Sequence, residues 1–238
     1  PLMYPDNSLG YSANFLRMMF GQPTEPYVVD PDIARTLDVL FILHADHEQN
    51  CSTSTVRMVG SAQTNLFASI TAGICALWGP LHGGANTAVM QMLMELEEQG
   101  ENADAITFTK NKLAKKEKIM GFGHRVYKTF DPRARHLQKM AQSLSEETGH
   151  EELYRWSMDM LNTMKSEKNI DPNVDFFSAT VYFSMGIQPD LYTCIFTMSR
   201  IAGWAGHYME QMGHNRLVRP RALYVGEKNV AYTPIEER

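Results

Sequence analysis

The sequence predicts an all-α protein, and two observations support this class. Apolar residues recur at helical spacing in several separate stretches of the 238-residue chain. No stretch alternates apolar and polar residues for long enough to indicate a β-strand, and the sequence contains no internal repeat or low-complexity segment. We therefore expect helices packed on helices.

The first predicted helix begins at Asp30-Pro31, where the aspartate supplies an N-cap and the proline fits the first helical position. Its inner face carries Ile33, Leu37, Leu40 and His44 at helical spacing, with His47 expected three residues on along nearly the same face. The next helix, from Asn65 to Trp78, is apolar or small on all sides, which is typical of a helix buried in a large core. Gly79-Pro80 should end it.

Three further helices follow. One starts near Ala85, runs to Glu98 and turns Val89, Leu93 and Leu96 inward. A second opens at Asp131-Pro132 and carries Leu137, Met140 and Leu144 on one face, and a third begins at Pro189 and carries Leu191, Ile195, Met198 and Ala202. The polar stretch from Glu95 to Lys118 reads either as a surface crossing between two lobes or as a solvated helix pair.

Composition limits the class of protein. A net charge of -5 with dispersed basic residues argues against nucleic-acid binding. The longest apolar stretch, Ile70 to Trp78, is interrupted by Gly73 and is far shorter than the roughly 20 residues of a membrane span, so we expect neither a membrane protein nor a signal peptide. Three cysteines outside any CxxC motif predict no disulfide framework or thiolate metal site, and they fit a reducing cytoplasm. Because the chain opens on Pro1, we expect a fragment.

Histidines and carboxylates fall at the expected ends and turns of the helices. They occur in LHADHEQN (43–50), GPLHGGAN (79–86), GFGHRVYK (121–128) and PNVDFFSA (172–179). Any one of these segments is weak evidence, because a histidine beside glycine is often only a turn residue. Their order and spacing along one helical chain nevertheless indicate acid-base chemistry on a carbonyl substrate.

The HADHE segment leaves three interpretations open. His44, Asp46, His47 and Glu48 are all competent metal ligands, but their order is not HExxH and His44 continues an apolar stripe. The cluster could therefore be a metal site, a purely structural group or a site with a substrate-binding histidine.

His82 lies between Gly79-Pro80 and Gly83-Gly84, just before a predicted helix. Backbone can approach a ligand closely there, and a helix N-terminus disfavours a cationic imidazole. A neutral histidine at this place can donate a hydrogen bond to a developing oxyanion. The alternative is a turn histidine that only fills space.

The other two segments suggest an anion site and a base. His124 lies in a glycine-bracketed loop with basic residues close by, and because GxGxxG is absent this loop predicts phosphate or carboxylate binding rather than a dinucleotide site. Asp175 precedes Phe176-Phe177, and such an apolar setting should raise the pKa of its carboxyl towards the range of a general base. Alternatively, Asp171 to Asp175 only caps a helix.

Taken as a set, LHADHEQNCSTSTVRMVGS, LWGPLHGGAN, MGFGHRVYKTFDPRA, NVDFFSA, SRIAGWAGH and RPRALY resemble the citrate synthase family in its bacterial form. The resemblance runs from about Tyr4 to Val225 and covers the C-terminal part of family members, whose N-terminal helices are missing here. It implies an all-α fold of two lobes. Residues 1–83 and 191–238 would belong to the large helical domain and residues 84–190 to the small one.

The resemblance also implies a reaction, in which acetyl-CoA condenses with oxaloacetate and citryl-CoA is hydrolysed to citrate and CoA. Asp175 would take a proton from the acetyl methyl group, His82 would hydrogen-bond the thioester oxygen, and His124 would polarise the keto oxygen of oxaloacetate. His47 would contact oxaloacetate. The implied carboxylate clamps are Arg133, Arg200 and Arg219, the last from the partner subunit.

The resemblance further implies a homodimer or a dimer-based hexamer, with no cofactor and no metal. Arg125 and Lys128 would be the coenzyme A contacts. Two other functions are also compatible with the sequence. A 2-methylcitrate synthase would use the same residues on propionyl-CoA, since one pocket methylene discriminates by only ~1 to 3 kcal/mol. A metal-dependent hydrolase would use the HADHE cluster.

Overall fold

The computed structural model describes residues 2–124, 126–127 and 129–238, and within them the fold is all-α, as predicted. The only β-type pairings there are two isolated bridges, Gln22 with Glu25 and Phe122 with Pro172. The α-helices are α1 (Tyr11–Phe20), α2 (Pro31–Ala45), α3 (Cys51–Ser61), α4 (Leu66–Trp78), α5 (Ala85–Glu97), α6 (Ala105–Ala114), α7 (Pro132–Thr148), α8 (Glu151–Lys168), α9 (Val174–Ser184) and α10 (Tyr192–Gly213). Short 3-10 turns are η1 (Gly100–Asn102), η2 (Pro189–Leu191) and η3 (Ile235–Glu237).

Three of the predicted helix starts, at Asp30-Pro31, Asn65 and Asp131-Pro132, are confirmed and carry side-chain caps. The helix predicted to begin at Pro189 instead opens with the 3-10 turn η2, and α10 begins only at Tyr192. The Asp30 carboxylate accepts the N–H groups of Asp32 and Ile33 at the start of α2, and the Asp131 carboxylate accepts that of Arg133 at the start of α7. Asn65 caps α4 by accepting the N–H of Ala68. These side chains satisfy donors that the first helical turn leaves without an intrahelical partner, which fixes where each helix begins.

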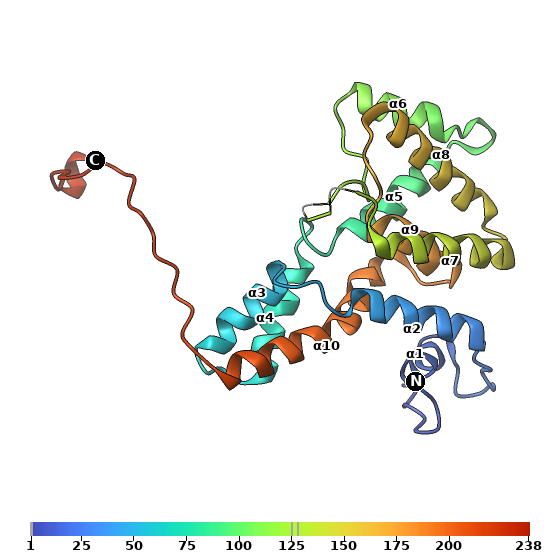
Figure 1. The fold of residues 1–238 in the computed structure, drawn as a ribbon, viewed down its shortest axis with the longest axis horizontal. Helices are drawn as coiled ribbons and strands as arrows, with labels where there is room; N and C mark the ends of the chain where they lie inside the picture. Colours follow the sequence, from blue (N-terminus) through green and yellow to red (C-terminus); the bar gives the residue numbers. More distant parts are fainter. Residues whose placement is uncertain (1, 125, 128) are drawn as a thin grey trace.

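Two hydrophobic cores hold the helices together. The larger one joins α1 and α2 to α5–α9 and has fully buried Leu37, Leu93 and Phe176 among its members. The smaller one lies between α3, α4 and α10 and is built on Val56, Leu77 and Trp204. Figure 1 shows the α3–α4–α10 group on one side of the molecule and α5–α9 on the other. Long helix α10 packs against α2, α3 and α4 and also touches α5, so it links the two cores.

The prediction that α4 is buried on all sides was wrong. Only Ser69, Gly73 and Leu77 of this helix are buried, whereas Phe67 and Trp78 are 82% and 77% exposed. An apolar composition indicates that a helix packs against other elements, but it does not identify those elements or the face that they bury. Here α3 and α10 cover one face of α4 and leave the other open.

Three smaller predictions also need correction. α2 ends at Ala45, so His47 lies in the turn after the helix rather than on its face. Ala202 is exposed, because the buried face of α10 instead includes Ser199, Arg200 and Trp204. The polar stretch 95–118 is no crossing between lobes: it contains the end of α5, η1 and α6, and α6 packs against α8. The helix-pair interpretation of this stretch is therefore the correct one.

After α10 the chain runs as an extended, exposed segment that leaves the rest of the molecule (Figure 1). Among the helices described, none has the length and the apolar character that crossing a membrane requires.

Candidate active site

A pocket of about 990 Å³ lies where several helices begin, and it gathers most of the residues singled out from the sequence. Its walls include the first turns or caps of α3, α5, α7 and α9 and a segment of α10. The predicted residues that line it are His47, His82, His124, Arg133, Asp175 and Arg200. Segments far apart in the sequence thus supply a carboxylate, imidazoles and guanidinium groups to one cavity.

Asp175 is the carboxylate of the site. It is the second residue of α9, and its backbone N–H donates to the Asn173 side chain at 3.0 Å, so Asn173 rather than Asp175 caps the helix. Burial raises the pKa of the Asp175 carboxyl from 3.8 to about 6, although nearby Arg133 acts in the opposite direction. The apolar setting therefore has the predicted effect, and the carboxylate remains mostly ionised at pH 7.

His82 is held against the start of α3. The Ser52 backbone N–H donates to its Nε2 at 3.2 Å, and the Ser52 hydroxyl lies 2.8 Å from the same nitrogen. Because a backbone N–H can only donate, Nε2 is an acceptor and the neutral ring carries its proton on Nδ1. Burial, followed by the charge of Arg200, lowers the pKa of His82, which keeps the ring neutral. The neutral state agrees with the sequence-based expectation, but its cause is burial.

His124 has the opposite tautomer. Its Nδ1 accepts the backbone N–H groups of Val126 at 3.0 Å and Tyr127 at 3.1 Å, so a neutral ring carries its proton on Nε2. The His47 ring lies 5.1 Å from the His124 ring, centroid to centroid, and its Nε2 is 3.3 Å from the Tyr127 hydroxyl. Burial, followed by the charge of Arg133, lowers the pKa of His47. Backbone N–H groups therefore fix the acceptor nitrogen of both His82 and His124.

Arg133 lies in the first turn of α7 and forms a two-point ion pair with Asp131. Its Nε is 3.1 Å from Oδ1 and its Nη2 is 2.8 Å from Oδ2 of that carboxylate. Asp131 is fully buried. The guanidinium carbon of Arg133 also lies 5.8 Å from the centre of the Tyr127 ring. The pair fixes the guanidinium in one orientation at the pocket wall.

Arg200 is the second arginine of the pocket and is only 2% exposed. Its Nε donates to the His44 carbonyl at 2.6 Å, and its guanidinium lies 4.7 Å from the centre of the Phe196 ring. Burial, with a contribution from Arg133, lowers its pKa to about 10, so it stays cationic at neutral pH. A buried cation of this kind favours an anionic ligand in the pocket.

The HADHE side chains diverge. His44 is buried, donates from Nδ1 to the Leu40 carbonyl at 2.9 Å, and has a pKa lowered by burial to about 3. Asp46 accepts from Nε2 of His207 at 3.0 Å, whereas His47 lines the pocket. In the described part of the chain, no group of three or more His, Cys, Asp or Glu side chains is arranged to hold a metal ion. His44 thus has the structural role, and the geometry does not support the hydrolase interpretation.

The remaining predicted residues lie elsewhere. Arg219 is exposed in the segment that follows α10 and does not line the pocket of its own chain. The predicted coenzyme A contacts Arg125 and Lys128 lie outside the described residues.

Several residues of the site were missed from the sequence. Ser52 orients His82 and also accepts the indole N–H of Trp204 at 3.3 Å. Asn86 in α5 donates to the Asp175 carbonyl at 3.1 Å and to the Ser178 hydroxyl. Asp131 orients Arg133. Serine, asparagine and aspartate in a first helical turn usually indicate capping, so their sequence signal is hidden by a commoner role.

The fold and the pocket together define a helical protein with an acid-base site suited to anionic ligands. Comparison with known families identifies the family to which this protein belongs. The family described as "Citrate synthase, C-terminal domain" matches residues 1–221. The citrate synthase of Corynebacterium glutamicum is 48% identical over all of this chain and 56% of its own length, and citrate synthase 1 of Mycobacterium tuberculosis is 45% identical over all of this chain and 57% of its own. The chain belongs to the citrate synthase family.

Solved structures agree with this assignment. Citrate synthase from Thermoplasma acidophilum, in a ternary complex with carboxymethyl coenzyme A and oxaloacetate, superposes with a TM-score of 0.89 at 35% identity and covers all of this chain and 62% of that one. Citrate synthase from Thermotoga maritima gives 0.85 at 37% identity, covering all of this chain and 63% of that one. The chain spans a little over half the length of the curated relatives named above.

Proposed function

We propose that the protein is a citrate synthase that condenses acetyl-CoA with oxaloacetate and hydrolyses citryl-CoA to citrate and CoA. The observation that carries this proposal is the pocket in which Asp175, His82 and His124 meet Arg133 and Arg200. Relatives named citrate synthase, and a related structure whose ligands are oxaloacetate and a coenzyme A derivative, support it.

In the first step Asp175 removes a proton from the methyl group of acetyl-CoA. A carboxylate whose pKa is about 6 is a stronger base than an ordinary aspartate and is still ionised at pH 7. The Nδ1–H of neutral His82 donates to the thioester oxygen as negative charge develops there, which gives an enol. Ser52 supports this step because its N–H occupies Nε2 and leaves the proton on Nδ1.

In the second step the enol carbon attacks the keto carbon of oxaloacetate, and the enol O–H proton returns to Nδ1 of His82 as the thioester carbonyl re-forms. His124, with its proton on Nε2, polarises the keto oxygen and then protonates the alkoxide. Arg133 and Arg200 bind the substrate carboxylates, and His47 contacts the same substrate. Hydrolysis of the citryl thioester then releases citrate and CoA and makes the sequence irreversible. Arg125 and Lys128 remain candidate coenzyme A contacts.

We further propose that two lobes, residues 84–190 and the remainder, close over oxaloacetate. The two joining segments are bonded to each other: the Thr87 hydroxyl donates to the Pro189 carbonyl at 3.0 Å, and the Thr193 hydroxyl donates to the Gly83 carbonyl at 3.1 Å. Because both chain crossings lie together, a small change in their backbone angles can rotate one lobe against the other.

The active form is proposed to be a homodimer, alone or within a hexamer. The exposed apolar face of α4, with Phe67 and Trp78, needs cover of the kind that a symmetric partner supplies. The segment after α10 extends away from its own subunit, which is consistent with Arg219 reaching the partner's pocket. All three cysteines are free thiols, which supports a reducing compartment such as the cytoplasm.

The decisive experiment is a thiol-release assay on the protein expressed at the full length of its reading frame. Oxaloacetate should give rapid CoA release with acetyl-CoA and slower release with propionyl-CoA. Faster release with propionyl-CoA would assign a 2-methylcitrate synthase instead, and no release with either would reject the proposal.

A further inference from the structure

Helix α10 holds the turn that carries His47. This turn, Asp46 to Asn50, follows the end of α2, and here it is called the His47 turn. Glu48 within it has a φ of 48°, a left-handed backbone conformation that is unfavourable for a residue with a side chain. The turn needs outside contacts to keep this conformation, and with it the place of His47 at the pocket wall.

Part of that support is close backbone packing. At Gly203 of α10, the Cβ atom of any larger residue would lie 2.2 Å from the Ala45 carbonyl oxygen and 3.1 Å from the Asp46 side chain. Only glycine permits this approach. One turn earlier on α10, Arg200 bonds the His44 carbonyl. One turn later, His207 reaches Asp46 itself.

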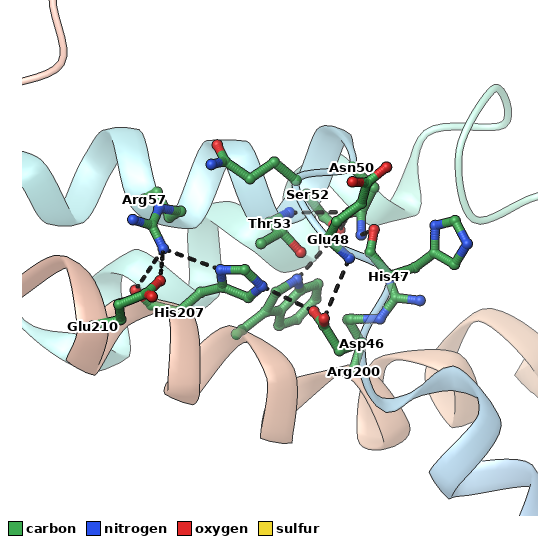
Figure 2. A network of polar contacts seen from close by, with 12 residues as sticks. Asp46, His47, Glu48, Asn50, Ser52, Thr53, Arg57, Arg200, His207 and Glu210 are labelled. Atoms are coloured by element: carbon green, nitrogen blue, oxygen red, sulfur yellow. Dashed lines mark hydrogen bonds and ion pairs between the residues drawn. The ribbon is translucent and has the colours of Figure 1, made fainter. Parts of the chain in front are cut away.

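The contact with Asp46 belongs to a chain of polar bonds (Figure 2). Glu210 bonds Nη1 of Arg57 at 2.6 Å, and the same Nη1 lies 3.1 Å from Nδ1 of His207. Nε2 of His207 is 3.0 Å from Asp46 Oδ1, and Asp46 Oδ2 accepts the Glu48 N–H at 3.3 Å. The last bond links the Asp46 side chain to the backbone N–H of Glu48, the left-handed residue of the His47 turn.

The order of donors along this chain is determined. Arginine only donates, so Nδ1 of His207 accepts from Arg57 and the ring proton lies on Nε2, directed at Asp46. Figure 2 shows His207 between Arg57 and Asp46, with the His47 ring on the other side of the turn. His207 is absent from the pocket lining, and its ring contacts the His47 turn through Asp46.

We propose that His207 is a positioning residue for oxaloacetate binding: it holds the Asp46 carboxylate on the Glu48 N–H and so keeps His47 at the pocket. This inference rests on the proposed function. Without His207, Asp46 loses its orienting donor and the strained turn relaxes, which moves the His47 imidazole.

The test compares variants of His207 by calorimetric titration with oxaloacetate. His207→Phe keeps a ring but removes the donor, and it should weaken binding about threefold to tenfold, the effect of one lost hydrogen bond. His207→Gln restores an N–H near Nε2 and should bind within about twofold of wild type. The matched control is His214→Phe, a like substitution at the exposed end of α10, which should leave the affinity unchanged.

A double-mutant cycle separates positioning from general destabilisation. If His207 acts through Asp46, the double variant Asp46→Ala with His207→Phe binds oxaloacetate no more weakly than Asp46→Ala alone. Losses that multiply, or a His207→Phe variant with a lower melting temperature but wild-type affinity, would overturn the inference.

A second readout needs no substrate. The ring NMR signals of His47 should shift in His207→Phe and return in His207→Gln, and unchanged signals in both variants would refute the positioning role. Wild-type protein that neither binds oxaloacetate nor releases thiol would instead reject the proposed function. Wild-type turnover together with an unaffected His207→Phe would reject only this inference.

Discussion

Asp175→Asn should stabilise the protein at neutral pH while it abolishes turnover. The folded protein raises the pKa of this carboxyl from 3.8 to about 6, mainly by burial. Since the folded state holds the proton more tightly than the unfolded state, the wild type loses stability as pH rises through this range. Asparagine has a similar shape and no charge to bury, so the variant avoids the loss.

The size of the effect follows from the two pKa values. Linkage predicts that the variant gains about 1 kcal/mol over wild type at pH 4.5 and about 3 kcal/mol at pH 7, with no further gain at higher pH. All other titrating groups are common to the two proteins and cancel in the difference. The gain is therefore specific to Asp175 in both its size and its pH range.

The assay is urea unfolding of both proteins between pH 4.5 and 8, at one protein concentration because assembly affects apparent stability. Thiol release should be lost in the variant, and in wild type kcat/KM should fall below about pH 6 as Asp175 becomes protonated. A variant equal to wild type at pH 7, or a gain that does not depend on pH, would refute a base whose pKa is raised by burial.

Three further predictions concern the mechanism and the assembly. His82→Gln should lower kcat by about 10²- to 10³-fold in steady-state thiol release, because the thioester oxygen loses its donor; a change in KM alone would indicate a binding role. Exhaustive chelation should leave activity unchanged, whereas a loss restored by zinc would revive the metal interpretation. Mixing inactive Arg219→Leu and Asp175→Asn subunits should restore about a quarter of wild-type activity, since half of the dimers are mixed and each has one intact site. No recovery despite proven exchange would exclude a site shared between subunits.

The elements that the sequence predicted correctly are those whose signals are local. Asp30-Pro31 and Asp131-Pro132 each combine a cap with a residue that starts a helix, and both helices begin there. The end of α2 was harder to locate, because no glycine or proline separates His44 from His47. The predicted helical face was therefore continued to His47, beyond the actual end of α2 at Ala45.

Long-range features could not be read in the same way. The apolar composition of α4 predicts that the helix is buried. Which of its faces is exposed depends on the helices that pack against it, and composition does not identify those helices. The pocket members were predicted as a set from their motifs, yet the tautomer of His82 depends on the N–H of Ser52, 30 residues away in the sequence. The tautomer of His124 depends on the loop conformation that turns the N–H groups of Val126 and Tyr127 towards its ring. Residue type gives the chemistry available, and the backbone selects which atom performs it.

The positions of the helix starts explain how a chain of net charge -5 can favour an anionic substrate. The pocket is lined at the beginnings of α3, α5, α7 and α9, and each such end carries a partial positive charge. Arg133 and Arg200 add full positive charges in the same place. This field attracts carboxylates and opposes protonation of His47 and His82. It would also hold Asp175 fully ionised and weakly basic if burial did not act against it, so the raised pKa of that carboxyl is what makes a base possible in a cationic pocket.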